Sequence, residues 1–529
     1  MRVLIVTGLL ANSIVTKSLS GARSRRFDNE VCILPVPVAS LMSLEYIASM
    51  LEKRDLSNVD LVLIPGLIKG DASRVERRIN VKTRKGPKNA ADLSAILEVA
   101  KKIELSTVIP ADELVSKANM IDAENALFRI EKEAMLKRAR GMMALGSGRR
   151  KVLVGSSFPM RVLAEIVDAS GLPTDEIQRV ARYYVISGVD IIDVGMIAGG
   201  GNPEDAARAV KAIRRCTAKP VSIDTSAPEE IEAAVRAGAD LILSINAENM
   251  KDVAAFAAHK PVVVTSAGRH HKVAEDVEDR LRQLDVNIRT ARSLGFRRII
   301  ADPILNPILT PNSAKSICAY LRFRETHPET LVLFGAGNVT ELIDADSFGA
   351  NMVLAGLAAE VGANILLTTE ASVKTRGSAK ELVRAVKMIT LAKARKTAPE
   401  DLGIDLLAMK EKRWKEEPYV NDKGTRQLSG QTIQKHMRDP KGSFKVAIDR
   451  RENELILAHY QYGRVRPDLL IKGSDPEKII HTAILSKLVS RLDHAFYLGR
   501  ELEKAKIALD TGKSYVQDLP IFFGRDRPD

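Results

Sequence analysis

Two stretches, KPVSIDT (residues 219–225) and RIIADPILNP (residues 298–307), share one pattern. Each is a short apolar run typical of a buried strand, and each ends on a carboxylate, Asp224 or Asp302. In a barrel of parallel strands the carboxyl ends of the strands face the active site, so an acid there is a candidate site residue. The alternative is an aspartate that caps the next helix. Because the pattern occurs in two strand–helix units, we favour a site.

The chain around these stretches repeats the same alternation. Eight apolar runs and eight helical patterns follow one another over about 245 residues, the length of a TIM barrel. Continuous apolar runs are typical of parallel strands that are buried on both faces. The sequence therefore predicts a central (β/α)8 barrel of class α/β, within residues 149–398. The expected strands are KVLVGSS (151–157), VDIIDVG (189–195), KPVSIDT, ADLILSIN (239–246), KPVVVTSAG (260–268), FRRIIADP (296–303), TLVLFGAG (330–337) and ANILLTTE (363–370).

Residues 1–148 predict a small parallel α/β domain followed by a charged linker helix at 123–142. Its expected strands are RVLIVTG (2–8), EVCILPVPVAS (30–40), VDLVLIPG (59–66) and STVIPAD (106–112), with helical patterns between them. Gly8 and the Pro65–Gly66 pair fall at strand ends, where open α/β sheets bind ligands. The basic segment 71–90 is either an anion-binding loop or a solvated face, and for a charge run alone we favour the solvated face.

Residues 399–529 change in character. SFKVAID (443–449) and LILAHY (455–460) indicate a hairpin, and VRPDLLIKG (465–473) indicates a further strand. Two long helical patterns follow, with a break expected near Asp493. We predict a separate C-terminal α+β module that flanks the barrel in sequence.

The composition is that of an ordinary globular protein, with 45% hydrophobic and 28% charged residues. No apolar run is long enough to suggest a membrane span. The net charge is +13, but the excess is spread along the chain without interleaved aromatic residues, so anionic small substrates explain it as well as nucleic acid does, and we expect no nucleic-acid partner. The three cysteines (Cys32, Cys216 and Cys318) lie far apart, which fits a cytoplasmic protein without disulfides and predicts no metal site made by protein ligands alone.

The predicted strand ends supply a set of polar side chains for the barrel mouth. They are Ser156, Ser157, Asp193, Asp224, Ser244, Asn246, Thr265, Ser266, Asp302, Asn338 and Glu370. In the last loop Lys374 and Arg376 precede a helix that begins near Ser378, and two cations beside a helix N-terminus suit a phosphate or pyrophosphate. Buried carboxylates suit a flat heterocycle that offers several N–H donors, such as the guanidine-like edge of a pterin.

The chain resembles the pterin-binding barrel of dihydropteroate synthase and of the pterin-dependent methyltransferases. The matching stretches are GVDIIDVG (188–195), VSIDTSAPEEIEAAVRAGAD (221–240), IIADPILNP (299–307) and KTR (374–376). The modules at both ends are similar to those of archaeal-type dihydropteroate synthase-like proteins. The chain differs from dihydropteroate synthases after the seventh expected strand, where Asn338 stands near the place of the family lysine.

The resemblance implies a role for each matching residue. It implies catalytic roles for Asp224, Asp302 and Lys374, and anion binding by Lys374 and Arg376. It also implies pterin contacts, for which the candidates are Asp193, Asp224, Asn246, Asp302 and Asn338. Mg²⁺ is expected to enter with the pyrophosphate substrate, and a homodimer is expected from the family.

The resemblance further implies a reaction. An arylamine would attack a dihydropterin that bears a methyl pyrophosphate, and pyrophosphate would leave. The arylamine would be 4-aminobenzoate or a phosphorylated ribofuranosyl-aminobenzene, in folate or tetrahydromethanopterin biosynthesis. Two alternatives remain open: a pterin-dependent methyltransferase, favoured by Asn338 and in need of a separate acceptor chain, and a non-catalytic pterin-binding protein.

Overall fold

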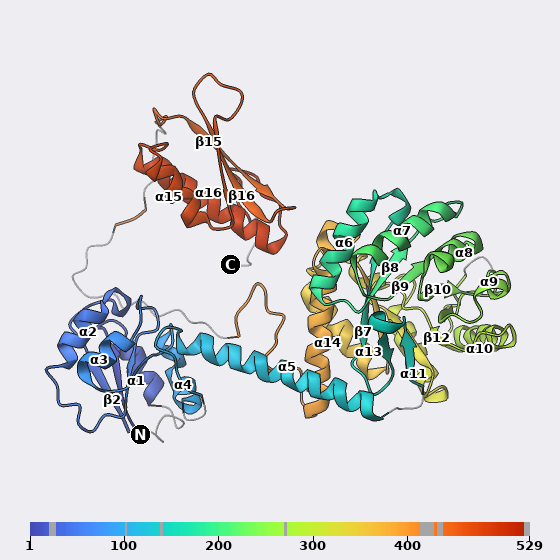
Figure 1. The fold of residues 1–529 in the computed structure, drawn as a ribbon, viewed down its shortest axis with the longest axis horizontal. Coiled ribbons are helices and arrows are strands. Elements are labelled where there is room, and N and C mark those ends of the chain that lie inside the picture. Colours follow the sequence, from blue (N-terminus) through green and yellow to red (C-terminus); the bar gives the residue numbers. More distant parts are fainter. Residues whose placement is uncertain are drawn as a thin grey trace. The chain divides into compact units, whose positions relative to one another are not determined.

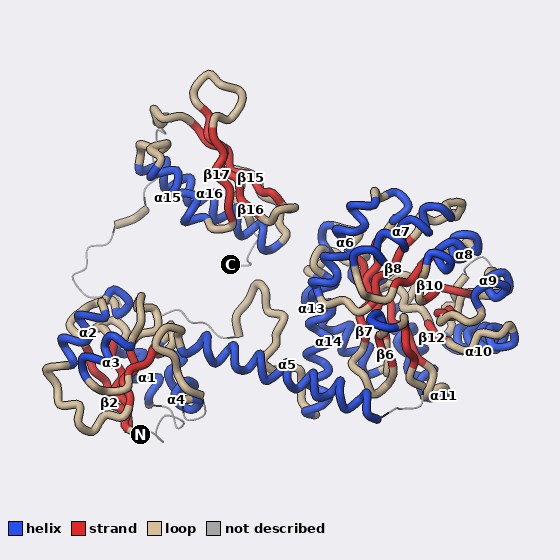
Figure 2. The backbone as a smooth tube through the Cα atoms, in the orientation of Figure 1, coloured by secondary structure: helices blue, strands red, loops and turns tan. Residues whose placement is uncertain are grey.

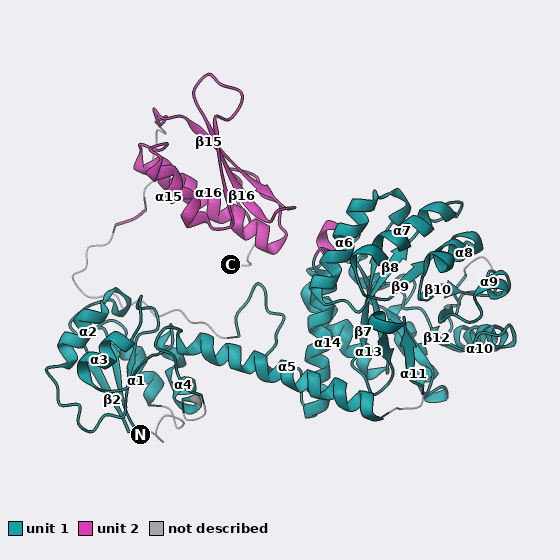
Figure 3. Ribbon diagram, in the orientation of Figure 1, with its two compact units in different colours: residues 1–371, 377–419 teal, residues 372–376, 420–529 magenta. Residues whose placement is uncertain are grey.

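A computed structural model describes residues 1–20, 28–100, 103–137, 141–268, 272–412, 428–430 and 437–522 of the chain. It divides into two compact units, residues 1–371 with 377–419, and residues 372–376 with 420–529 (Figure 3). None of the helices in the described ranges is long and apolar enough to cross a membrane.

Eight parallel strands close into a barrel in the order β10-β11-β12-β13-β14-β7-β8-β9, which confirms the predicted TIM barrel (Figures 1 and 2). The strands are β7 (Arg161–Ile166), β8 (Ile191–Gly195), β9 (Val221–Asp224), β10 (Leu241–Ile245), β11 (Val262–Thr265), β12 (Ile299–Asp302), β13 (Leu331–Gly335) and β14 (Ile365–Thr369). The helices around them are α6 (Thr174–Ser187), α7 (Pro203–Cys216), α8 (Pro228–Ala237), α9 (Met250–Ala257), α10 (Val277–Ser293), α11 (Ser313–Thr326), α12 (Gly337–Thr340), α13 (Ser347–Glu360) and α14 (Ser378–Arg395).

Local sequence signals set the ends of several barrel helices. Pro203 and Pro228 occupy the first turns of α7 and α8, where the missing N–H leaves no helical hydrogen bond unmade. Gly188 and Gly238 end α6 and α8 with φ of 90° and 107°, a left-handed conformation that glycine adopts without steric strain. Asp276 caps α10 by accepting the amide hydrogens of its first turn. These signals fix where the helices begin and end. Because all the barrel strands run parallel, their carboxyl ends lie at the same end of the barrel.

The first barrel strand is not the one that the sequence predicts. The run KVLVGSS contributes β6 (Val152–Val154), which pairs antiparallel with β5 (Met143–Leu145), and the barrel begins only at Arg161. Leu145 and Val154 are fully buried among the inward-facing side chains of the barrel strands. The hairpin thus uses its apolar residues to fill the barrel interior, which explains why its sequence resembles a barrel strand. Ser156 and Ser157 therefore do not lie at the end of a barrel strand.

The N-terminal domain is a four-stranded parallel sheet in the order β2-β1-β3-β4, with helices packed on both faces. Its strands are β1 (Arg2–Thr7), β2 (Asp28–Ile33), β3 (Leu61–Ile64) and β4 (Thr83–Lys85), and its helices are α1 (Asn12–Leu19), α2 (Leu44–Leu51), α3 (Ser73–Ile79) and α4 (Leu93–Val99). The predicted parallel α/β fold is confirmed. One detail was wrong, because the fourth strand is the basic TRK rather than STVIPAD. The basic segment 71–90 holds α3 and β4. The charged helix α5 (Ala111–Lys137) follows.

The C-terminal unit confirms the predicted α+β module. β15 (Ser443–Asp449), β16 (Glu454–Tyr460) and β17 (Leu469–Gly473) form an antiparallel sheet, and α15 (Pro476–Leu485) and α16 (Leu492–Thr511) pack on it. The break between the helices falls at residues 486–491, close to the predicted position. The imidazole of His494 lies 3.0 Å from Asp439 through its Nδ1 atom, so this helical histidine has an internal partner.

The hairpin β5–β6 generates a stability prediction. Leu145→Ala should lower the free energy of unfolding by about 3 kcal/mol, because it leaves a cavity in the barrel interior. Urea unfolding measures the change. Leu136→Ala, at an exposed position of α5, is the control and should change the stability by less than about 0.5 kcal/mol. Equal effects of the two substitutions would show that the hairpin does not pack inside the barrel.

Candidate functional site

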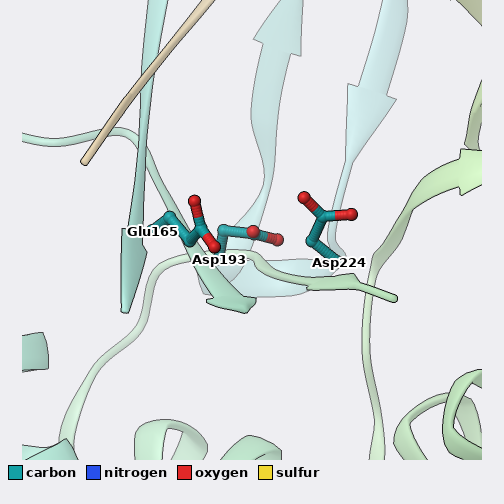
Figure 4. Close-up of side chains that lie close together, drawn as sticks. All are labelled: Glu165, Asp193 and Asp224. Carbon is teal, nitrogen blue, oxygen red and sulfur yellow. The ribbon is translucent and has the colours of Figure 1, made fainter. Parts of the chain in front are cut away.

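Four carboxylates lie at the carboxyl ends of barrel strands. Glu165 comes from β7, Asp193 from β8, Asp224 from β9 and Asp302 from β12. Carboxylate oxygen atoms of the first three all lie within 4.8 Å of one another (Figure 4). We refer to Glu165, Asp193 and Asp224 as the carboxylate triad.

The strand register explains why the triad forms. Glu165 is directly opposite Asp193 in the pairing of β7 with β8, and Asp224 is opposite Gly195 in the pairing of β8 with β9. A side chain at residue 195 would collide with the carboxylate of Glu165, so the glycine at this position makes room for that carboxylate. The sequence DVG of β8 therefore supplies one member of the triad and the space for another.

Asp193 is the most deeply buried member of the triad. Its side chain is 0% exposed, and among the described residues neither carboxylate oxygen has a hydrogen-bond partner of good geometry. Burial raises the pKa of Asp193 well above its usual range, the charges of Asp224 and Glu165 raise it further, and the nearby Ser222 hydroxyl and Val194 amide only partly oppose this. A buried carboxyl group with open acceptor positions is typical of a site that receives a cation or a hydrogen-bond donor.

Burial also raises the pKa of the other two triad members. Burial, reinforced by Asp224, raises the pKa of Glu165 to about 7, and burial, reinforced by Asp302, raises the pKa of Asp224 to about 7. Near neutral pH the triad therefore holds fewer than three negative charges. It can take up or release a proton in the range where enzymes work.

Asp302 differs from the triad because it is held by donors. The hydroxyl of Tyr320 and the backbone N–H of Ile304 each donate a hydrogen bond of 2.8 Å to its Oδ1 atom. Burial raises its pKa to about 6, while these hydrogen bonds and the charge of Arg280 lower it. Tyr320 on α11 is itself almost fully buried, so the orientation of the Asp302 carboxylate is fixed before any ligand arrives.

The predicted amides have local partners. The Oδ1 atom of Asn246, which is buried, accepts the amide hydrogen of Glu248 at 2.8 Å and closes the turn after β10. The Nδ2 atom of Asn338 donates to the carbonyl oxygen of Leu305 at 2.9 Å and ties the start of α12 to the loop that follows β12. Their proposed contacts with a pterin stay predictions.

The predicted cations lie in the loop between β14 and α14. Lys374 belongs to a single 3₁₀ turn, Val373–Thr375, and Arg376 follows it directly. Residues 372–376 group with the C-terminal unit. Anion binding by Lys374 and Arg376 stays a prediction.

Sequence reasoning missed Glu165, because the first barrel strand was assigned to residues 151–157. The signal was available in RVLAEI, an apolar run that ends near an acid in the same way as KPVSIDT. Placing the strand at 151–157 also leaves about 16 residues before the next helix, which is long for a strand–helix connection in an α/β unit. Tyr320 and Arg280, which set the environment of Asp302, lie on α11 and α10, and no motif marks them.

Comparison with known proteins places this geometry in a family. Residues 169–369 match the family model described as pterin binding enzyme, residues 438–518 match PterinBD-DUF4346, and residues 1–88 match a family of unknown function, DUF6513. An uncharacterized protein of Methanocaldococcus jannaschii is 36% identical over 535 residues, which cover 99% of each chain. The chain belongs to the dihydropteroate synthase-like family of pterin-binding proteins with extra N- and C-terminal regions.

Solved structures with a similar barrel include two dihydropteroate synthases. The Yersinia pestis enzyme in complex with a pterine-sulfa conjugate is 19% identical, with a TM-score of 0.39, and covers 48% of this chain and 100% of its own. The Xanthomonas albilineans enzyme in complex with 7,8-dihydropteroate is 22% identical, with a TM-score of 0.38, and covers 48% of this chain and 99% of its own. In this dihydropteroate synthase-like chain the residues matching the pterin-binding model include the strands that carry Asp193, Asp224 and Asp302.

The triad generates a prediction about pH and stability. At Asp224 the native state holds a proton more readily than the unfolded chain between about pH 4 and pH 7, because burial raises the pKa of this group from 3.8 to about 7. Stability contributed by this group is therefore lost as the pH rises through that window. Asp224→Asn removes the group and should stabilise the protein at pH 8 by on the order of 2 kcal/mol, with little change at pH 4.

Urea unfolding at the two pH values measures this difference. Asp175→Asn, at an exposed position of α6, is the control and should affect stability equally at both. A variant at residue 224 that is no more stable than the wild type at pH 8 would contradict the assignment of Asp224 to a cluster of repelling acids.

Proposed function

We propose that this protein is a pterin-utilizing transferase of the dihydropteroate synthase type. In the proposed reaction the amino nitrogen of an arylamine attacks the methylene carbon of a dihydropterin-6-methyl pyrophosphate. A C–N bond forms, the C–O bond to the pyrophosphate breaks, and the amine loses a proton. The arylamine is 4-aminobenzoate or a phosphorylated ribofuranosyl-aminobenzene. The observation that carries the proposal is the set of four carboxylates at the mouth of a barrel whose sequence matches the pterin-binding model.

Asp302 is suited to hold the pterin ring. A carboxylate accepts two hydrogen bonds from a guanidine-like edge, and such paired, charge-assisted bonds are strong and directional. Tyr320 and the Ile304 amide occupy only the Oδ1 side of Asp302, so they fix the group without exhausting its acceptor capacity. Asp224 would contact another polar edge of the ring. Both acids would stabilise the positive charge that develops as pyrophosphate departs.

The residues of the triad also suit the Mg²⁺ that is expected to enter with the pyrophosphate. Mg²⁺ prefers oxygen ligands and commonly binds through one or two carboxylates together with substrate phosphates. The buried Asp193 oxygens, which lack good partners among the described residues, fit this requirement. Glu165, Asp193 and Asp224 would hold the cation, which neutralises charge on the leaving group when it is bound. Lys374 and Arg376 are proposed to bind the same anion, and Lys374 is proposed to act in catalysis.

An assay of pyrophosphate release tests the reaction. With dihydropterin pyrophosphate and either arylamine, the wild type should release pyrophosphate, and Asp302→Asn should lower kcat/KM by about 100-fold or more, a loss typical of removing one preorganised electrostatic group. Asp175→Asn, at an exposed position in the first turn of α6 and outside the group of four carboxylates, should retain the wild-type rate. If the wild type releases no more pyrophosphate than the Asp302→Asn variant, the transferase proposal fails. Methyl transfer from a methylated pterin would then support the methyltransferase alternative.

A binding experiment tests the cation ligands separately from activity. Millimolar Mg²⁺ should raise the Tm of the wild type at pH 8, because a cation that binds only the folded state stabilises it. The rise should shrink at pH 6, since protons compete for groups such as Glu165 and Asp224, whose pKa burial raises to about 7.

Glu165→Gln should abolish most of the Mg²⁺-dependent rise in Tm. Glu204→Gln, at an exposed position in the first turn of α7, is the matched control and should retain it. The same increase in both variants would exclude the triad as the cation site and leave the pyrophosphate itself as the main ligand.

A further inference from the structure

The N-terminal domain contains a cavity of about 290 Å³ that the barrel chemistry does not use. It lies at the carboxyl ends of the two central strands, where Val6 and Thr7 of β1 and Leu63 and Ile64 of β3 line it. This volume is at the lower end of the range typical of small-molecule sites. Most of its lining lies in residues 1–88, the segment that matches a family of unknown function.

The topology of the sheet places this cavity where α/β domains bind ligands. In the order β2-β1-β3-β4, the chain leaves β1 towards one edge of the sheet and leaves β3 towards the other. The helix after β1, α1, packs on one face with α4, whereas α2 and α3 pack on the opposite face. The carboxyl ends of β1 and β3 therefore form the topological switch point, where the strand order reverses. Open α/β sheets bind ligands in the crevice outside this point.

Backbone hydrogen bonds join the loops around the cavity in pairs. On one side, the N–H groups of Leu9 and Leu10 donate to the carbonyl oxygens of Val36 and Pro37 at 2.9 and 3.1 Å. These bonds connect the loop after β1 to the loop after β2. Gly8 permits the approach, because a Cβ atom there would meet the Val36 carbonyl at 2.7 Å.

The other side is built in the same way. The N–H of Gly66 donates to the Pro87 carbonyl oxygen at 3.1 Å, and the N–H of Gly86 donates to the Ile64 carbonyl oxygen at 2.7 Å. Pro37, Pro65 and Pro87 line the cavity from the loops after β2, β3 and β4, and each fixes its own backbone φ. The walls are thus largely formed in the free protein, which lowers the entropic cost of binding a ligand.

The lining indicates the chemistry of the ligand. It is mainly aliphatic, and among the described residues that line the cavity none is acidic, while Lys88 is basic. Lys88 is paired with Glu113 at 2.6 Å, so it contributes a hydrogen-bond donor more than a free charge. Ala11, the N-cap residue of α1, and Val15 also line the cavity, and this end of the helix has no side-chain cap and no acid in its first turn. An apolar ring matches the walls, and an anionic group matches this end of the helix.

We propose that the N-terminal domain binds a small organic molecule that combines an apolar ring with one anionic group, independently of the pterin site of the barrel. The ring lies between the proline-bearing loops, and the anionic group lies toward the start of α1. The full chain therefore carries two small-molecule sites of different chemistry. One is rich in carboxylates at the barrel mouth, and the other is apolar and free of acids among its described lining residues.

Fluorescence titration of the full-length protein with 8-anilinonaphthalene-1-sulfonate tests the proposal, since this probe carries apolar rings and one sulfonate. The wild type should show saturable binding that excess pterin does not displace. Leu10→Asp and Leu67→Asp place a carboxylate at the cavity, at positions that are 65% and 54% exposed, and each should weaken binding by at least tenfold. Ile186→Asp, at an exposed apolar position on α6, should bind the probe like the wild type.

Hydrogen exchange of the wild type locates the probe without any substitution. Binding should slow exchange at residues 8–15 and 63–67 and leave the barrel unchanged. Unaltered affinity in both cavity variants, or protection confined to other parts of the chain, would overturn the proposal. Displacement of the probe by pterin would overturn its independence from the barrel site.

Discussion

The site depends on one constraint: a closed barrel brings several acids together at the carboxyl ends of its strands, and Asp193 among them is fully buried. Two unit charges about 4 Å apart repel by roughly 4 kcal/mol at an effective dielectric constant near 20, which is a large part of the stability of an ordinary domain. Burial, reinforced by this repulsion, raises the pKa of Glu165 and of Asp224 to about 7, so the triad keeps protons near neutral pH. A site of this kind is poised to exchange protons for a cation or for N–H donors.

The four acids are distinguished by what surrounds them. Asp302 has its orientation fixed by Tyr320 and by a backbone N–H, whereas Asp193 is buried without a good partner among the described residues. The first arrangement suits recognition of a rigid ring, because the acceptor geometry exists before binding. The second suits a partner that brings positive charge. Environment rather than residue type therefore separates the proposed pterin contact from the proposed cation contact, as it separates paired carboxylates in other active sites.

Much of this arrangement could be predicted from the sequence, because parallel barrel strands have a plain signature and their carboxyl ends point one way. Asp224 and Asp302 were found by that rule. Glu165 was not, since the apolar hairpin strand Val152–Val154 imitates a barrel strand while filling the barrel interior. A hydrophobic pattern indicates that a segment is buried, but it does not identify the elements against which the segment packs. The short strand Thr83–Lys85 was missed for a related reason, because three residues carry no periodicity at all. Lys374 and Arg376 group with the C-terminal unit, and local sequence patterns carry no information on how segments far apart in the chain pack together.

The central claim is that the acids at the barrel mouth together bind one dihydropterin pyrophosphate, through its ring and through the cation at its pyrophosphate. A crystal structure of the protein with a dihydropterin-6-methyl pyrophosphate tests it most directly. The account predicts that Asp302 and Asp224 both lie within hydrogen-bonding distance of the same pterin ring, with the pyrophosphate beside the carboxylate triad and a cation between them. A pterin bound elsewhere on the chain, or one that contacts neither aspartate, would contradict it.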